Sequence, residues 1–181
     1  MGAAQPFHGH WPSMLRTAGP AIMALCSSGD RPFEDVERCQ DIVRGLSEYF
    51  TDDVPDRVAR DLGVHHGWVV IEEGSLVGLA IVDRRSTQAA EILWIAVQAG
   101  RRHGGLGTSL LEHVLEELGA EGVKLVGAKT LDGSATYEPY RATRAFWERQ
   151  GFVQIDMIDP PPGWQPGNPA AIYVCSLGPT R

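Results

Sequence analysis

Cysteine is scarce in this sequence, and its three cysteines lie far apart. Cys26, Cys39 and Cys175 are odd in number, and no C-x-x-C spacing occurs. Disulfide frameworks use an even number of cysteines and structural zinc sites use closely spaced ones, so the sequence predicts neither. Free thiols are typical of a reducing compartment, and we therefore expect a cytoplasmic protein.

Positive charge and long apolar runs are scarce as well. The formal net charge is -7 at pH 7, which argues against a nucleic-acid-binding surface and is compatible with a cationic amine as substrate. No stretch approaches the roughly 20 apolar residues of a transmembrane helix. The run 18–26 resembles a signal-peptide core, but Pro20 interrupts it and no cleavage site follows. We expect neither nucleic acid nor membrane among the partners.

Two pairs of histidines are the remaining candidates for metal ligands. His8 and His10 lie near the N-terminus, and His65 and His66 follow a predicted helix. Neither pair has carboxylate or cysteine partners that the sequence can assign. We interpret the first pair as solvated tail residues and the second as turn residues, and we predict no metal site.

The length of 181 residues predicts one domain that is large enough to bury a core. Hydrophobic residues make up 43% and charged residues 22%, which is typical of a globular protein. Residues 1–30 contain scattered Gly, Ala, Pro and Ser without periodicity, and we expect a flexible extension there. A single domain is expected to follow at residues 31–181.

Hydrophobic periodicity predicts helices and strands from Phe33 onward. A first helix is expected from Phe33 to about Phe50, and Asp53 with Pro55 predicts a capped second helix that ends at Leu62. Three antiparallel strands are expected next, followed by helix, strand, helix and two strands. Their ranges are 68–71, 76–82, 91–97, 106–118, 124–130, 140–150, 152–159 and 171–177. The strand at 124–130 should run parallel to the strand at 91–97 through a right-handed crossover.

The stretch 91–118 joins an apolar strand to an amphipathic helix through a glycine-rich turn. Gly104, Gly105 and Gly107 lie between the two elements. Glycines let the backbone approach an anion closely, and the start of a helix offers unpaired N–H groups and a positive dipole end. The spacing matches neither the G-x-G-x-x-G dinucleotide fingerprint nor the Walker loop, because no lysine follows Gly107. The turn therefore predicts a phosphate-binding site of another kind.

The turn contains an Arg-x-x-Gly-x-Gly pattern over residues 102–107, RHGGLG. It resembles the acyl-CoA pyrophosphate loop of the GNAT superfamily, the general-control-related N-acetyltransferases. Residues 140–152, YRATRAFWERQGF, are similar to the second motif of that family. The resemblance covers roughly Phe33 to Leu177 and is to bacterial-type enzymes that act on small molecules or proteins. It implies the GNAT fold, an α/β fold with a mixed, mostly antiparallel sheet that is splayed in the middle and flanked by about four helices.

The resemblance also implies where acetyl-CoA binds as cosubstrate. The pantetheine arm is expected to lie in the splay beside the third strand, and the pyrophosphate on the glycine turn. The implied binding residues are Ile95, Ala96, Val97, Arg102, His103, Gly104, Gly105, Leu106, Gly107, Thr108, Thr143, Phe146 and Trp147. A backbone N–H within 95–97 is expected to stabilise the thioester oxyanion.

Glu91 is the candidate general base. It begins a strand similar to that of lysine-acetylating members of the family, and burial there is expected to raise its pKa toward neutrality. The alternative interpretation is a strand-end glutamate that is exposed to solvent or paired with Arg84 or Arg85.

The general acid differs from the family pattern, because Trp147 stands where the motif has tyrosine. An indole N–H donates a hydrogen bond but does not readily release its proton to a thiolate. Tyr140 is the candidate acid, with Tyr137 or water as alternatives. Trp147 has the alternative role of packing on the pantetheine arm or in the core.

The predicted function is transfer of an acetyl group from acetyl-CoA to a primary amine, by direct attack in a ternary complex. Aromatic residues of the first helices and the last hairpin are expected to line the acceptor pocket: Tyr49, Phe50, Trp164 and Tyr173. The acceptor is a small-molecule amine or a lysine, and the sequence does not choose among them. The alternative is a non-catalytic acyl-CoA-binding sensor or regulatory module, and either protein would be a monomer or a homodimer.

Overall fold

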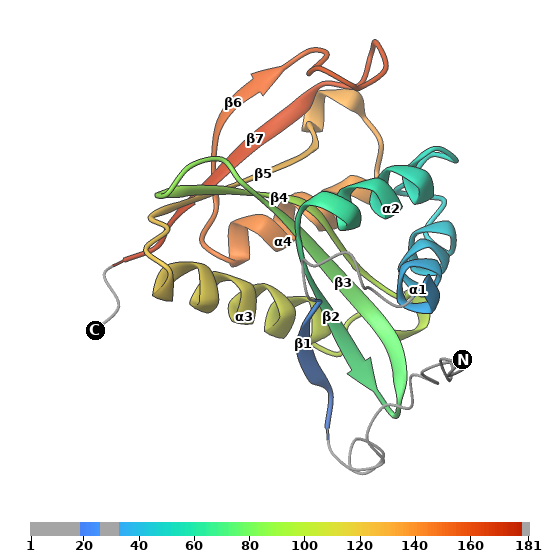
Figure 1. Ribbon diagram of the computed structural model, residues 1–181. Coiled ribbons are helices and arrows are strands. Elements are labelled where there is room, and N and C mark those ends of the chain that lie inside the picture. The colour runs from blue at the N-terminus through green and yellow to red at the C-terminus, as the bar shows by residue number, and fades with distance from the viewer. Residues whose placement is uncertain (1–18, 26–32, 179–181) are drawn as a thin grey trace, which may run out of the picture.

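The computed structural model describes residues 19–25 and 33–178. Within these residues the chain forms seven strands, four α-helices and two short 3-10 helices (Figure 1). In chain order they are β1 (Ala21–Leu25), α1 (Phe33–Arg44), α2 (Val54–Val64), β2 (His66–Glu72), β3 (Ser75–Arg84), β4 (Ala89–Val97), η2 (Ala99–Arg101), α3 (Leu106–Ala120), β5 (Leu125–Leu131), η3 (Gly133–Ala135), α4 (Pro139–Arg149), β6 (Val153–Ile158) and β7 (Ala170–Ser176).

The strands form one sheet in the order β1-β2-β3-β4-β5-β7-β6. Every neighbouring pair is antiparallel except β4 and β5, which run parallel. The helix α3 makes the crossover between these two parallel strands, as the order strand, turn, helix, strand predicts. The mixed, mostly antiparallel sheet and its four helices confirm the predicted fold class.

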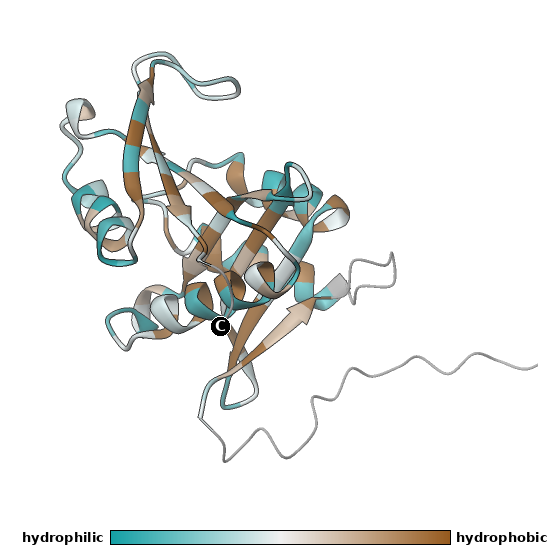
Figure 2. Cartoon of the chain, turned by 90° about the vertical axis from the view of Figure 1, so that its left-hand side faces the viewer, coloured by the Kyte–Doolittle hydropathy of each residue, from teal (hydrophilic) through white to brown (hydrophobic). Residues whose placement is uncertain are grey.

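Two hydrophobic cores cover the two faces of the sheet. On one face, α3 contributes fully buried Leu110, Leu111 and Val114, which pack with Trp147 of α4. On the other face, α1 and α2 pack against β2, β3 and β4, and Figure 1 shows these two helices across the sheet from α3. Each large apolar side chain buried in this way contributes about 1.5–3 kcal/mol. Figure 2 shows the central strands as mostly hydrophobic and the helices as mixed, as expected for helices that cover a sheet.

The strand β1 was not predicted. Residues 1–30 were expected to form a flexible extension, but Ala21–Leu25 pairs antiparallel with β2 from Ala21↔Ile71 to Leu25↔Gly67. Its five residues are too few to show a clear alternation. Residues 1–18 and 26–32 lie outside the described part of the chain.

Three local predictions on the first half of the chain were wrong. The helix α1 ends at Arg44 rather than near Phe50, because Gly45 is costly in a helix and the next residues form turns. Asp53 stands at the start of α2 but does not cap it, since its carboxylate accepts from Thr51 Oγ1 instead. His66 begins β2 rather than lying in a loop. None of these changes moves β4 or the glycine turn.

No helix in the described part of the chain is both long and apolar enough to cross a membrane.

Candidate active site

The strands β4 and β5 separate midway along their length. Their pairing runs from Ala89↔Leu125 to Ile92↔Ala128 and stops there. Beyond that point β4 continues to Val97, while β5 stays paired with β7 as far as Leu131. The two strands therefore form a V whose vertex lies at Ile92 and Ala128. This is the splay that the sequence led us to expect.

A β-bulge in β4 lies directly after the vertex. Trp94 pairs with Ile81 and Ile92 pairs with Val82, so Leu93 is an extra residue. As a result Leu93 and Trp94 both pack on the α1–α2 face, whereas Ile95 packs on the α3 face. A bulge bends a strand and increases its local twist, which accounts for the divergence of β4 from β5.

The backbone of β4 beyond the bulge has one unpaired edge. The N–H of Gln98 donates to the carbonyl of Val77 on the β3 side, at 2.8 Å. Because antiparallel strands alternate in the direction of their polar groups, Ile95 and Val97 direct theirs away from β3 and into the V. These residues, with Ala96 between them, are the predicted contacts for the pantetheine arm.

The glycine turn lies at the open end of the V and leads into α3. Gly105 adopts φ 82° and His103 adopts φ 66°, and no side chain caps the helix. The N–H of Ser109 makes the first main-chain hydrogen bond of the helix, to the carbonyl of Gly105. The earlier amides of Leu106, Gly107 and Thr108 have no acceptor within the helix. Unpaired amides at a helix start are suited to binding an anion.

Gly107 lies close to side chains of both β4 and α4. A methyl group at this position would lie 3.7 Å from Val97 Cγ2 and 3.9 Å from Phe146 Cε2. Phe146 of α4 thus stands beside both the end of β4 and the start of α3. Gln150 Nε2 donates to Thr108 Oγ1 at 3.2 Å, which ties α4 to the same turn. The glycine turn and α4, which carry the two predicted motifs, are therefore neighbours in space. Gly104 is exposed in the turn and does not take part in the contact between them.

Arg102 does not reach into the turn. Its Nη1 donates to Glu48 Oε1 at 2.9 Å, and its guanidinium lies 4.5 Å from the ring centroid of Tyr49. Both partners belong to the turn between α1 and α2. No sequence pattern indicates this pairing, because Glu48 and Arg102 lie in separate elements. In this conformation the charge predicted for the pyrophosphate is held by a carboxylate.

Glu91 is ion-paired on both of its oxygens. Oε1 lies 2.6 Å from Lys129 Nζ, and Oε2 accepts from Arg85 Nε at 2.9 Å. Burial raises the pKa of the carboxyl, but the hydrogen bonds and charges of Lys129 and Arg85 outweigh it, so the pKa of Glu91 lies below its ordinary value. The prediction of a raised pKa was wrong. The alternative interpretation, a glutamate paired with Arg85, describes the structure.

Lys129, the second partner of Glu91, was not predicted from the sequence. It follows Ala128 on β5, and its ammonium reaches across the vertex to β4. The register of the two parallel strands pairs Glu91 with Gly127, and Lys129, two residues later, lies on the same face. Lys129 could not be predicted as a partner of Glu91, because a sequence alone does not determine this register.

Tyr140 is held at the N-terminal end of α4. Its hydroxyl donates to the backbone carbonyl of Tyr49, and the two rings lie 5.4 Å apart. Burial, with smaller contributions from Tyr137 and Tyr49, raises the pKa of Tyr140 to about 12. The phenol therefore stays protonated, and its proton is already directed at a carbonyl oxygen.

Trp147 is buried between Phe146 and Phe152, with ring centroids 5.2 and 4.9 Å away. Its indole Nε1 is inaccessible to solvent and has no hydrogen-bond partner. A buried unpaired donor costs about 1–3 kcal/mol, so packing of the indole ring must offset the cost of its unpaired N–H. Thr143, one helical turn earlier on α4, is half-buried.

The four aromatic residues predicted to line the acceptor pocket lie in different environments. Tyr49 lies between Arg102 and Tyr140, and Phe50 packs edge-on against Trp94 of β4 at 6.0 Å. Trp164 is half-buried in the loop before β7. Tyr173 was assigned wrongly, because it is fully buried in the α3 core and its hydroxyl donates to Glu148.

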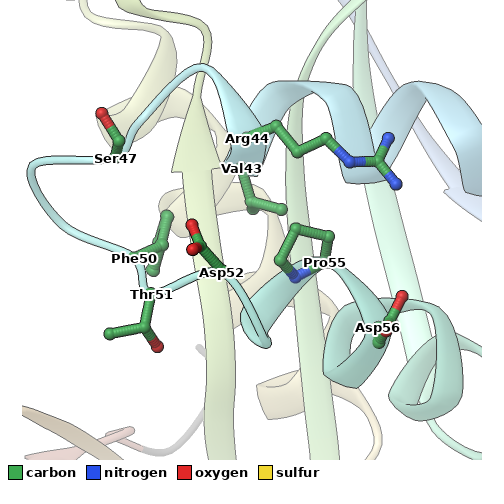
Figure 3. A pocket seen from close by; sticks show the side chains of 8 residues that line it. All are labelled: Val43, Arg44, Ser47, Phe50, Thr51, Asp52, Pro55 and Asp56. Carbon is green, nitrogen blue, oxygen red and sulfur yellow. The ribbon is translucent and has the colours of Figure 1, made fainter.

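A separate cavity of about 270 Å³ lies at the junction of α1 and α2 (Figure 3). Val43 and Pro55 line it between the helices, and Arg44 extends along α1 away from Asp52. None of its lining residues belongs to the predicted CoA or catalytic set. Phe50 connects it to Trp94 and so to β4. In the described residues no three histidine, cysteine or carboxylate side chains gather as metal ligands would.

Comparisons with known proteins point to one family. Residues 63–154, about half of the chain, match the Acetyltransferase (GNAT) domain family. Among solved structures, an acetyltransferase of the GNAT family from Desulfovibrio desulfuricans is 22% identical, with a TM-score of 0.74 over 87% of this chain and 99% of that chain. The ribosomal-protein-S18-alanine N-acetyltransferase from Escherichia coli is 20% identical, with a TM-score of 0.69 over 90% and 96%. No match was found among curated proteins.

A third structure contains a ligand. It is a GNAT family acetyltransferase from Elizabethkingia anophelis with acetyl-CoA bound, 16% identical, with a TM-score of 0.64 over 88% of this chain and 99% of that chain. At identities this low the structural likeness establishes the fold alone.

Proposed function

Because this chain belongs to the GNAT acetyltransferase family and is therefore an acyltransferase, we propose that it transfers an acetyl group from acetyl-CoA directly to a primary amine. One observation carries the proposal: the pairing of β4 and β5 ends at Ile92↔Ala128, and an uncapped helix start lies at the open end of the resulting V. The V suits an extended arm, and the helix start suits a pyrophosphate.

In the proposed complex, backbone groups of Ile95, Ala96 and Val97 bind the pantetheine amides as a neighbouring strand would. The amides of residues 103–108 bind the pyrophosphate. Thr143, Phe146 and Trp147 form the α4 side of the channel. The proximity of Gly107 to both Val97 and Phe146 supports this arrangement, because a Cβ atom at residue 107 would lie within 4 Å of both side chains.

The chemistry needs an oxyanion donor, and the proposed donor is an N–H of β4 beyond the bulge. The N–H of Ile95 is directed into the V on the vertex side of Val97, where the thioester would lie. A preorganised donor of this kind is commonly worth about 10²–10³ in rate.

The ion pairs of Glu91 favour water over this carboxylate as the general base. A carboxylate that two cations hold, with a lowered pKa, is a weak proton acceptor at neutral pH. We assign Glu91 the role of an anionic anchor and propose that the amine loses its proton through water. Tyr140, whose proton is committed to Tyr49, is assigned a positioning role at the acceptor side. The N–H of Trp147 then stabilises the departing thiolate by hydrogen bonding, without transferring a proton.

Thiol release from acetyl-CoA tests this proposal. The protein is incubated with acetyl-CoA and a panel of amines that includes polyamines, aminoglycosides, amino acids, aromatic amines and lysine peptides. Turnover that depends on one class supports an N-acetyltransferase and identifies the acceptor class. Calorimetric binding of acetyl-CoA without turnover on any amine would instead support the non-catalytic acyl-CoA-binding module.

A further inference from the structure

Lysine is the rarest charged residue of this chain. The sequence contains two lysines and fourteen arginines, so arginine provides nearly all of its positive charge. The two lysines are Lys124, directly before β5, and Lys129, within it. A guanidinium stays protonated in proteins and is not a nucleophile, whereas a lysine amine becomes one on losing its proton. A lysine at a reaction centre in such a chain is therefore chemically distinctive.

Lys129 lies at the vertex of the V. Ala128 forms the last pair with β4, and Lys129 is the next residue along β5. Its Nζ lies 2.6 Å from Glu91 Oε1, so the ammonium spans the two strands where they separate. About 36% of the side chain is exposed, which gives the ammonium access to water.

The polarity of β4 directs the reactive end of the cosubstrate toward this lysine. The glycine turn follows Val97 at the open end of the V, and Val97 lies five residue steps, roughly 17 Å of strand, from Ile92 at the vertex. An arm that is bound by its pyrophosphate at the turn and lies along β4 points its thioester toward the vertex. This step depends on the proposed function.

We propose that Lys129 is a site of self-acetylation by acetyl-CoA bound in the V. The ammonium first loses a proton to water. The Nζ lone pair then forms a C–N bond to the thioester carbonyl carbon, the C–S bond breaks, and the departing thiolate takes up a proton as free CoA thiol. The nitrogen loses its second proton to water, so the products are acetyl-lysine, CoA and one net proton.

Acetylation of Lys129 removes one of the two cations that hold Glu91. The carboxylate keeps Arg85, which also pairs with Asp83 at 2.9 Å, while Asp83 lies 3.5 Å from His65. The modification therefore changes the charge at the acceptor side of the vertex without touching the glycine turn. It is a means by which cosubstrate could alter the acceptor site.

Peptide mapping by mass spectrometry tests the proposal, and Lys124 is the built-in control. The full chain is incubated with acetyl-CoA without acceptor, and the acetylated fraction of each lysine is followed in time. We expect Lys129 to be acetylated at least about tenfold faster than Lys124, because positioning beside the thioester makes its reaction effectively intramolecular. Random chemical acetylation would label exposed Lys124 at least as fast, and that result would overturn the proposal.

Two variants separate the proposal from its alternatives. Lys129→Arg keeps the positive charge, and we expect it to bind acetyl-CoA but to lose the rapid labelling. Glu91→Gln removes the carboxylate charge that pairs with the Lys129 ammonium at 2.6 Å, and we expect it to label Lys129 faster than the parent chain, because the nitrogen is then freer to attack. Slower labelling would mean that Glu91 acts as the base and would overturn the water-mediated step.

Calorimetry with acetyl-CoA on the same samples separates the two levels of failure. Binding without preferential labelling of Lys129 overturns the self-acetylation proposal and leaves the proposed function standing. Absence of acetyl-CoA binding overturns both.

Discussion

The two ends of the V between β4 and β5 present different chemical groups. At the open end the glycine turn offers backbone amides at the start of α3, and Arg102, which precedes the turn, is paired with Glu48. At the vertex the reverse holds, because Glu91, Lys129 and Arg85 present charged side chains that pair with one another. One end offers unpaired main-chain amides, and the other is a network of ion-paired side chains.

This difference separates what each end can tolerate. An amide site depends on φ and ψ and is indifferent to pH in the range where carboxylates titrate. An ion-pair network depends on each partner's charge and is sensitive to pH. Changes of backbone should therefore affect binding of the cosubstrate, whereas changes of charge should affect the stability and chemistry of the vertex.

The largest effect is expected for Gly105→Val at the open end. Gly105 has φ 82°, a conformation that a β-branched residue adopts only with strain, and the added side chain would lie in the turn that we propose for the pyrophosphate. We expect acetyl-CoA binding to weaken by on the order of 100-fold, or about 2.7 kcal/mol, as measured by calorimetry.

Gly122→Val is the matched control, because Gly122 has φ 91° at the other end of α3 and open space around it. Both variants should lose similar stability, and only Gly105→Val should lose acetyl-CoA binding. Equal affinities in the two variants would show that the turn is not the cradle.

Glu91→Gln tests the vertex through stability. Hydrogen bonds to charged groups contribute about 1.5–3 kcal/mol, and we expect a loss of about 2 kcal/mol at pH 7 by denaturant unfolding. The folded pKa of Glu91 is depressed, so its contribution is present above the unfolded value and is lost as pH falls through the folded one. The difference between variant and parent should therefore vanish in acid.

Glu138→Gln is the control for this prediction, because Glu138 pairs with Arg141 on the exposed surface. Exposed pairs are worth about 0–1 kcal/mol. A loss as small for Glu91→Gln as for Glu138→Gln would show that the vertex network contributes nothing special.

Trp147→Phe tests the channel between the two ends. The parent indole N–H is buried without a partner, so its removal should cost little stability. If it donates to the departing thiolate, steady-state kinetics should show kcat lowered by about tenfold with KM unchanged.

Trp68→Phe is the control, because Trp68 is equally buried and its N–H donates to Glu117 at 2.8 Å. It should lose more stability, about 1 kcal/mol, and keep its kcat. An unchanged kcat in Trp147→Phe would assign Trp147 to the core alone.

The backbone geometry of the glycine turn could be predicted from the sequence, whereas the ion pairs at the vertex and at Arg102 could not, for a physical reason. Gly105 and Gly107 act through local backbone geometry, which spacing along the chain records. The pairs Glu91–Lys129 and Arg102–Glu48 depend on strand register and on how a turn folds back, which no local pattern records. Tyr173 shows the same limit, since one alternation along β7 decides between pocket wall and core.

The smallest effect is expected for Glu48→Gln at the open end, because this substitution releases the side chain of Arg102 beside the main-chain amides. In the present conformation Glu48 holds Arg102 at 2.9 Å, and acetyl-CoA must compete for that guanidinium if Arg102 is to bind pyrophosphate. Removing the carboxylate charge should therefore tighten acetyl-CoA binding by about threefold, or roughly 0.6 kcal/mol, by calorimetry. Glu37→Gln makes the same change in net charge on exposed α1 and should leave the affinity unchanged. Weaker binding in Glu48→Gln would mean instead that Glu48 positions Arg102 for the cosubstrate, so that the open end also depends on an ion pair.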